Sequence, residues 1–283
     1  MKSFSLLPTD AHLGAGLGLK AEHYEHAIAC EAPGLWFEVH PENYMVAGPR
    51  LTWLEAIAER HPLSLHGVSL SLAADQLPDA EHLYRLRALV NQVQPRLLSE
   101  HLAWSTWQGQ YHPDLLPFPR SQAALLRIVE NIHYAQDILA RPLAIENPSH
   151  YVHLEGHDFS EIDFLTELVQ RTGCSLLLDI NNVHVSAHNM GFEARAYLDA
   201  FPAHLISEIH LAGFSQDANS DLLIDTHDAP VVAEVWSLYR HLLQRTGPRP
   251  TLIERDDQIP PFEALLGERD TAQCLLDNLG IRP

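Results

Sequence analysis

The sequence predicts an α/β fold in which eight parallel strands and their crossover helices close into a (β/α)8 TIM barrel. Short apolar runs alternate with longer amphipathic stretches along the whole chain, and this alternation indicates parallel strands joined by helices. The 283 residues fall within the usual length of eight such units. A doubly wound sheet is the alternative, but Gly14-Ala-Gly-Leu-Gly18 does not have the glycine spacing of its phosphate-binding turn.

The elements follow in order along the chain. Eight apolar runs are the predicted strands: Gly14–Leu19, Leu35–Val39, Leu63–Leu70, Leu97–His101, Leu143–Glu146, Ser175–Ile180, Leu205–Leu211 and Thr251–Glu254. Helical periodicity between them is clearest in Glu81–Val93, Ser121–Leu139, Glu161–Thr172 and Val231–Arg245. Ser121 is the expected N-cap of one helix and Gly173 the expected end of another. Because we find no linker or low-complexity segment, we expect one domain over residues 1–283.

The charge balance limits the possible partners. With 18 Lys and Arg against 37 Asp and Glu, the net charge is −19, and binding to a polyanion depends on basic residues. We therefore expect no nucleic-acid partner. Histidine is more frequent than Lys and Arg together, with 19 copies, which suggests metal binding or proton transfer.

Cysteine usage and hydropathy bear on the compartment. The three cysteines, Cys30, Cys174 and Cys274, are far apart and have no metal-ligand spacing, which is typical of buried thiols in a reducing compartment. Pro8, Asp10 and His12 interrupt the N-terminal region where a signal peptide needs an apolar run. No stretch reaches the length of a membrane span, so we expect a cytoplasmic protein with no membrane contact.

Metal-capable side chains occur at the ends of six consecutive predicted strands: His66, His101, Glu146, Asp179, His210 and Glu254. Their spacings of 35, 45, 33, 31 and 44 residues are each close to one strand–helix unit. Active sites of barrel enzymes form at this rim, where each strand contributes a residue. Each residue alone has a structural explanation, but buried carboxylates in such a ring are costly unless cations compensate them.

Further candidate ligands lie close to this ring. Asp225 and His227 follow the seventh predicted strand, and Asn182 follows Asp179 by three residues. Mixed nitrogen and oxygen ligands without thiolate suit Zn, Fe or Mn. Since these candidates exceed what one ion uses, we expect two or three ions with Glu146 as a bridge.

The ring resembles the metal site of the xylose-isomerase-like barrels, including the trinuclear zinc nuclease endonuclease IV, which has a histidine where this chain has Asn182. The surrounding motifs are similar to those of the multinuclear non-haem iron-dependent oxidative enzymes (MNIO). They include Glu38-x-x-x-Glu42-Asn43-Tyr44, His66-Gly-Val-Ser-Leu-Ser71, Ser99-Glu-His-Leu-Ala-Trp104, Glu146-Asn147, Leu178-Asp-Ile-Asn-Asn-Val-His184, Ile209-His-Leu-Ala-Gly213 and Ile224-Asp-Thr-His227. These motifs cover nearly the whole chain in order. One departure is Arg255 after Glu254, where the family often has Trp, so it bears on the substrate pocket.

This resemblance implies two or three iron ions, mixed Fe(II)/Fe(III), that use O2 to modify cysteine residues of a ribosomally made precursor peptide. It also implies a separate partner protein that binds the peptide leader. His66, His101 and Glu146 would hold one iron. A second would be held by Glu146, Asp179, His210 and Glu254, and a third by Asn182, Asp225 and His227. Residues that would support the ligands or face the substrate are Asn43, Tyr44, Trp104, Asn147 and His184.

Two other functions stay open from the residues alone. The same ring on the same barrel would suit a zinc-dependent phosphodiesterase or nuclease, or a sugar isomerase. The net charge of −19 and the presence of Asn182 disfavour the nuclease. A metal-buffering or scaffold protein is the non-catalytic alternative. Open coordination positions would distinguish an enzyme from it.

Overall fold

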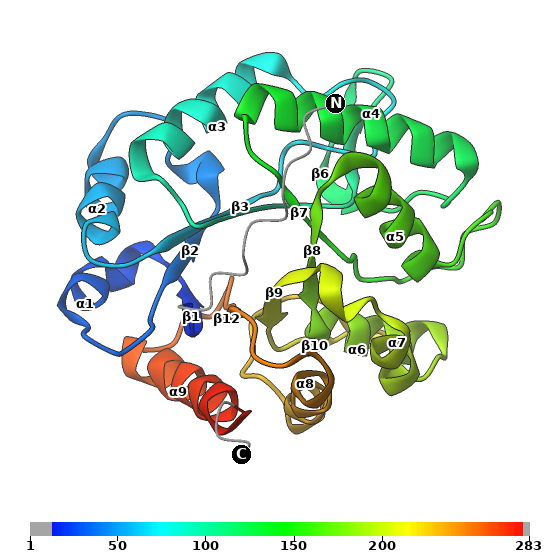
Figure 1. The fold of residues 1–283 in the computed structure, drawn as a ribbon. Helices are drawn as coiled ribbons and strands as arrows, with labels where there is room; N and C mark the ends of the chain where they lie inside the picture. The colour runs from blue at the N-terminus through cyan, green and yellow to red at the C-terminus, as the bar shows by residue number, and fades with distance from the viewer. Residues whose placement is uncertain (1–12, 280–283) are drawn as a thin grey trace.

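The computed structural model describes residues 13–279 and contains a closed barrel of eight parallel strands (Figure 1). All eight predicted strands are confirmed, and each is buried along most of its length. Around the barrel the order is β1-β2-β3-β4-β7-β8-β9-β12, and β12 pairs with β1 to close it. The strands are β1 (Ala15–Gly18), β2 (Phe37–Val39), β3 (Leu63–Gly67), β4 (Leu97–His101), β7 (Ala144–Glu146), β8 (Ser175–Asp179), β9 (Ile206–Leu211) and β12 (Thr251–Ile253).

Helices surround the barrel, with at least one after each strand (Figure 1). They are α1 (Tyr24–Ala29), α2 (Pro49–Ala58), α3 (Ala80–Val93), α4 (Gln122–Leu139), α5 (Glu161–Thr172), α6 (Ile180–Met190), α7 (Ala194–Ala200), α8 (Ala233–Thr246) and α9 (Phe262–Leu279). Short 3-10 helices occupy Ala21–His23, Pro41–Asn43 and Ala203–Leu205. The four helices named from the sequence are confirmed to within two residues at each end.

The predicted caps are in place. The hydroxyl of Ser121 accepts a 3.2 Å hydrogen bond from the backbone N–H of Ala124 at the start of α4. Gly173 ends α5 in the left-handed conformation, with φ of 70°, where glycine has no steric penalty. Local sequence signals therefore set these helix ends.

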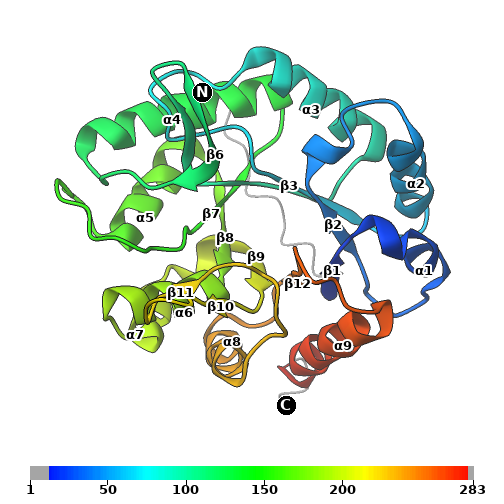
Figure 2. The ribbon, with the colours of Figure 1, turned by 180° about the vertical axis from the view of Figure 1, so that it is seen from behind.

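Two hairpins were not predicted, and α1, α2, α6, α7 and α9 were not among the helices named from the sequence. After β4 the chain forms β5 (Trp104–Trp107) and β6 (Gln110–Leu116), and after β9 it forms β10 (Ser215–Gln216) and β11 (Leu223–Ile224), which contacts α6 (Figure 2). The strand predicted to reach Ile180 ends at Asp179, because α6 begins directly there with the Asp179 side chain as its N-cap. The rim of the barrel is consequently extended by short hairpins after β4 and β9.

Helix α9 secures the closing seam between β1 and β12. Arg269 is almost fully buried, and its Nε donates a 2.8 Å hydrogen bond to the carbonyl of Ala15 on β1. Its guanidinium also donates to the carbonyl of Pro33 and, at 3.0 Å, to Gln273. A buried arginine with all these partners ties the last helix to the first strand. The N-terminal residues examined for a signal peptide lie outside the described residues.

Candidate metal centre

The six side chains predicted at the strand ends meet at one end of the barrel. Because parallel strands all end on the same side, neighbouring strands bring their last residues together. The sheet register pairs His101 with Glu146 and Asp179 with His210. Asp179 and His210 are fully buried, while His66, Glu146 and Glu254 are at most 5% exposed. The barrel thus encloses a ring of imidazoles and carboxylates.

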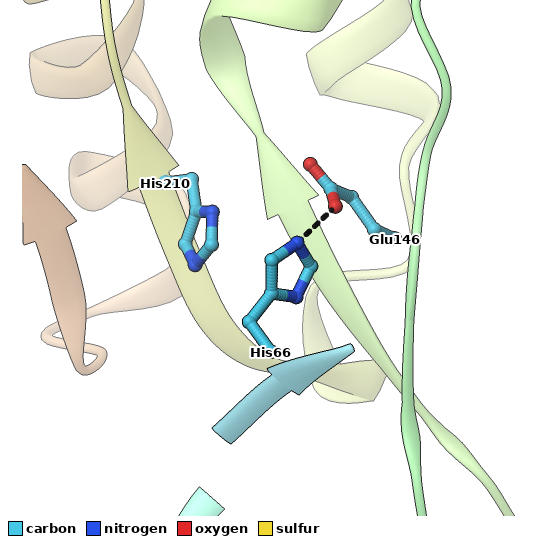
Figure 3. A group of neighbouring side chains, drawn as sticks. All are labelled: His66, Glu146 and His210. Carbon is cyan, nitrogen blue, oxygen red and sulfur yellow. Dashed lines mark ion pairs between the residues drawn. The ribbon is translucent and has the colours of Figure 1, made fainter. Parts of the chain in front are cut away.

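The first cluster consists of His66, His101 and Glu146. Oε2 of Glu146 lies 3.0 Å from Nε2 of His66 and 3.3 Å from Nε2 of His101. The two Nε2 atoms are themselves 3.3 Å apart. Figure 3 shows the pair of His66 and Glu146, with the imidazole of His210 on β9 beside them. All three ligand-type atoms therefore point to one location.

Hydrogen bonds hold these two imidazoles from behind. Nδ1 of His66 lies 2.8 Å from the hydroxyl of Ser99, and Nδ1 of His101 lies 2.9 Å from the carbonyl of Gly67. With Nδ1 engaged in this way, each ring directs Nε2 to the shared location beside Glu146. Such partners on the far nitrogen are the usual companions of metal-binding histidines.

The second cluster lies between β8, β9 and β12. Nδ1 of His210 is 3.1 Å from Oε2 of Glu254, and Asp179, His210 and Glu254 each have a ligand-type atom within 4.8 Å of the others. Asn147 fixes the backbone of this cluster, since its Oδ1 accepts a 2.8 Å hydrogen bond from the N–H of Asp179 and its Nδ2 donates to the carbonyl of Asp179 at 3.1 Å.

The loop after β11 brings Asp225 and His227 to the same ring. Nε2 of His227 is 2.7 Å from Oδ1 of Asp225, and its Nδ1 is 3.3 Å from Oε2 of Glu254. Asn182 lies on the first turn of α6 and donates from Nδ2 to Oε1 of Glu146 at 3.3 Å. The structure thus brings all nine candidate ligands into one connected group of side chains.

Burial and neighbouring charges shift the pKa values of the side chains in the ring. Burial disfavours the charged form of His66, but the charge and hydrogen bonding of Glu146, together with the charge of Glu38, outweigh burial and raise the pKa of His66 to about 10. Burial likewise opposes charge on Glu146, yet His101 and His66 lower its pKa to about 2. For Asp179, burial dominates and raises the pKa well above its usual value. Protons thus occupy nitrogen atoms where a metal cation would compete with them.

The residues fit a bound metal. Several buried ligand-type atoms have no aligned hydrogen-bond partner within residues 13–279: Glu146 Oε2, Asp179 Oδ2, Asn182 Oδ1, His210 Nδ1, His210 Nε2 and His227 Nε2. Histidine nitrogens in the ring lie about 3 Å from carboxylate oxygens. Their N–H bonds are not directed at those oxygens, so these contacts are not well-aligned hydrogen bonds. Unsatisfied polar atoms are costly to bury, and a cation among them would satisfy them together.

The five supporting residues predicted from the sequence have different positions. Asn43 is exposed, and Tyr44 is buried. The hydroxyl of Tyr44 lies 2.7 Å from the hydroxyl of Tyr24. Both Asn43 and Tyr44 line a cavity at the mouth of the ring. Trp104 belongs to the β5–β6 hairpin and donates from Nε1 to the carbonyl of Pro117 at 2.7 Å. The imidazole of His184 packs against the phenyl group of Phe214 and is not among the side chains that form the ring of candidate ligands. Asn147 braces Asp179, as described above.

Four polar residues near the ring were missed as candidate ligands. Glu38 and Glu208 are buried beside His210, while His40 and Asp256 lie beside Glu254 at the mouth. A signal was available for Glu208, because it precedes His210 by two residues on β9 and alternation along a strand places both on the barrel interior.

Two hollows open at the rim. The mouth cavity, of about 400 Å³, reaches Glu38 and Glu254, and is also lined by Lys20, Arg50 and Asp256. A second cavity of about 290 Å³ lies between the segments that follow His101 and Glu146, with apolar walls that include Phe118, Phe164 and Phe192. The mouth cavity therefore borders the ring at Glu254.

The fold and the ring define a xylose-isomerase-like barrel with a candidate metal centre. Similar solved structures include the 3-keto-D-glucoside 4-epimerase YcjR from E. coli, with a TM-score of 0.56, 11% identity and coverage of 93% of this chain and 98% of that one. The IOLI protein with a bound zinc atom has a TM-score of 0.55 and 11% identity, covering 94% and 99%. A xylose isomerase domain protein from Planctomyces limnophilus has a TM-score of 0.53 and 12% identity, covering 96% and 97%. At such identities the likeness shows the fold alone.

The sequence places the chain in a particular family. The family described as "RiPP precursor modification enzyme MbnB/TglH/ChrH" matches residues 14–277, so the chain belongs to it. A UPF0276 protein of Caulobacter vibrioides is 62% identical over 264 residues, covering 93% of this chain and 94% of the relative. One of Bordetella bronchiseptica is 48% identical over 273 residues, covering 94% of each. The family resemblance inferred from the motifs is therefore confirmed.

Across residues 13–279, none of the helices combines the length and apolar character required to cross a membrane.

Proposed function

We propose that this chain is a multinuclear iron enzyme that uses O2 to modify cysteine residues of a ribosomally made precursor peptide. The observation that carries the proposal is the buried ring itself, which joins nine nitrogen- and oxygen-bearing side chains in a member of a family of precursor-modifying enzymes. The donor set contains no thiolate, since the described cysteines are all free and none belongs to the ring. Imidazole and carboxylate together suit iron, manganese or zinc.

The ligands divide into three overlapping sets. His66, His101 and Glu146 would hold one iron, and Asp179, His210 and Glu254 would hold a second with Glu146 shared between them. The third set comprises Asn182, Asp225 and His227. A shared carboxylate suits Glu146, because its Oε2 faces two imidazoles while its Oε1 faces Asn182.

Bound iron would supply a Lewis acid for the substrate thiolate and electrons for O2. The protein provides position and exclusion of water. Ser99 and Gly67 hold the imidazoles of His66 and His101 from behind. The mouth cavity admits the peptide beside Glu254, where Lys20 and Asp256 form a 2.7 Å ion pair at its edge.

We propose further features that accompany this activity. A separate protein binds the leader of the precursor, and the reaction takes place in the cytoplasm, where the three free cysteines are stable as thiols. One domain spans residues 1–283. The precursor reaches the mouth cavity through the rim, because the ring is closed off on the other sides by the packed barrel.

Metal analysis and a peptide assay test the proposal together. Protein purified without oxygen or chelators should contain two or more irons per chain, with a mixed-valent component in the Mössbauer spectrum. It should change the mass of a Cys-containing precursor encoded beside its gene only when O2 is present, and a Cys→Ser precursor should stay unchanged. Zinc without iron, retained after growth in iron-rich medium, would instead favour the zinc hydrolase or sugar isomerase.

A further inference from the structure

His210 has a carboxylate facing each of its two ring nitrogens. Nδ1 lies 3.1 Å from Oε2 of Glu254, within the second cluster of the ring. Nε2 lies 3.2 Å from Oε1 of Glu38, on the opposite side of the imidazole. A neutral imidazole has one N–H and one free lone pair, so the partner of one nitrogen decides which nitrogen is available to a metal.

Glu38 is held in one orientation. It lies in the centre of β2, and the register of β2 and β3 places it opposite Ser64. The hydroxyl of Ser64 donates a 2.6 Å hydrogen bond to Oε2 of Glu38. Both residues are at most 4% exposed, so their side chains have little contact with solvent. The second oxygen, Oε1, is thereby directed at His210.

Two of the other three imidazoles in the ring, those of His66 and His101, are supported in a similar way but through the opposite nitrogen. His66 and His101 have Nδ1 beside a hydroxyl or carbonyl oxygen and Nε2 at the shared location. In His210 the nitrogen at the cluster is Nδ1, and the one beside a supporting oxygen is Nε2. The support of His210 is also the only one of these three that carries a negative charge.

Nε2 of His210 has no aligned hydrogen-bond partner among the described residues, and Oε1 of Glu38 lies within reach of it at 3.2 Å. We propose that Glu38 is a positioning residue that accepts a hydrogen bond from Nε2–H of His210 when the imidazole turns to bind the metal held with Asp179 and Glu254, and so keeps Nδ1 free for that metal. The inference rests on the proposed metal site but adds a residue outside its ligand set. A carboxylate behind a metal-binding histidine fixes the tautomer and orientation of the ring and strengthens it as a ligand.

Glu208 is the competing partner for the same nitrogen. Its Oε1 lies 3.6 Å from Nε2 of His210, farther than Oε1 of Glu38. Neither oxygen of Glu208 has a hydrogen-bond partner among the described residues, whereas Ser64 anchors Glu38. Glu208 is therefore the matched control, being a buried carboxylate near the same atom without the anchored geometry.

The experiment compares the wild type with Glu38→Gln, Glu208→Gln and Ser64→Ala, using Zn²⁺ as a diamagnetic probe. Metal-free protein is titrated with Zn²⁺ against a chelator of known affinity. Long-range 15N–1H spectra of the Zn²⁺-loaded proteins then report which nitrogen of His210 carries the proton, with His210→Asn to assign the signal. Circular dichroism verifies that each variant is folded.

We expect Glu38→Gln to weaken one class of Zn²⁺ site by about 10–100-fold and to shift or broaden the Nε2–H signal of His210. Glu208→Gln should change the affinity much less, and Ser64→Ala should give an intermediate loss even if Glu38→Gln fails to fold. An unchanged affinity and an unchanged His210 signal in Glu38→Gln would overturn the inference, as would an equal loss in Glu208→Gln. If the wild type binds no Zn²⁺ or Fe²⁺ at all, the proposed metal site fails and this inference fails with it.

Discussion

Asn182 and Glu146 connect two parts of the candidate metal centre, because Nδ2 of Asn182 donates a 3.3 Å hydrogen bond to Oε1 of Glu146. A second bond from the same nitrogen reaches the carbonyl of Asn147 at 3.0 Å. With Nδ2 occupied twice, Oδ1 of Asn182 is buried and has no partner among the described residues. The amide is therefore oriented with its oxygen free, which suits a neutral and weak ligand.

The first prediction concerns the third metal. Asn182→Ala should lose one metal ion per chain while the other two sites stay filled, because a neutral amide oxygen contributes to only one ligand set. Iron titration of metal-free protein, followed by elemental analysis, measures the stoichiometry. Asn131→Ala is the control, since Asn131 is a buried asparagine of α4 whose Nδ2 donates to the backbone carbonyl of Leu72, in the segment after β3, and not to a candidate ligand. Unchanged iron occupancy in Asn182→Ala would exclude Asn182 as a ligand.

A second prediction concerns Glu146 as the shared carboxylate. Glu146→Ala should lower the content of at least two metal ions together, since its oxygens face both the first cluster and Asn182. In metal-free protein the same change should reduce the free energy of unfolding by about 3–5 kcal/mol, the usual cost of breaking a buried ion pair. Denaturant titration measures the second effect. A loss of a single ion, with the rest retained at full affinity, would contradict a bridging role.

Metal removal should destabilise the folded protein. Ligands that come from several separate strands exist as a set only in the folded state, so a metal binds the native chain and stabilises it. At a free metal concentration of about 100 times the dissociation constant, the gain is about 2.7 kcal/mol. Thermal unfolding with a chelator, and after Fe²⁺ is restored without oxygen, should show a concentration-dependent rise of Tm. A Tm that is independent of added metal would argue against the site.

The pH dependence of stability should include a contribution from Glu161 on α5. Burial alone would raise the pKa of Glu161, but the hydrogen bonds from His150 at 2.5 Å and from Tyr197 at 2.8 Å, with the charge of His150, lower it. Because the folded pKa lies below the unfolded value of about 4.3, this stabilisation is complete above that pH. It is lost as the pH falls through the folded pKa.

Glu161→Gln tests this contribution. Metal-free wild type should lose more unfolding free energy than Glu161→Gln between neutral pH and pH of about 3. Glu167→Gln is the control on the same helix, where Glu167 forms an i,i+4 ion pair with Arg171 at the surface and should contribute little. If the unfolding free energy depends on pH equally in the wild type and in Glu161→Gln, the hydrogen bonds of Glu161 do not contribute to stability.

The sequence predicted the barrel well because its strands are apolar runs that recur at a regular interval. The hairpin formed by β5 and β6 was missed for a local reason. Its turn at Gln108-Gly109 has both residues at positive φ, which suits a tight hairpin but lacks the Asn or Asp that usually marks one. Pro113 within β6 also weakens the strand pattern. Insertions of this kind depend on local contacts that periodicity does not reveal.

Most of the ring could be predicted because its residues occupy the ends of strands, where the barrel brings them together. Glu38 was quoted only as part of a motif, since it lies in mid-strand and its importance depends on how the ring of His210 turns. Side-chain rotation of this type follows from packing across strands far apart in the sequence. The sequence alone also left His184 unplaced, and its position against Phe214 became known only from the fold.

The distribution of the ring along the chain affects how the protein is made. The candidate ligands begin at His66 on β3 and end at Glu254, directly after the last strand of the barrel. During synthesis the early histidines emerge long before their final carboxylate partner, and the barrel cannot close until β12 lies beside β1. The newly made chain therefore cannot bring its candidate ligands together until β12 and Glu254 have been synthesised and β12 lies beside β1. Loading of the proposed metal centre would therefore follow closure of the barrel rather than precede it.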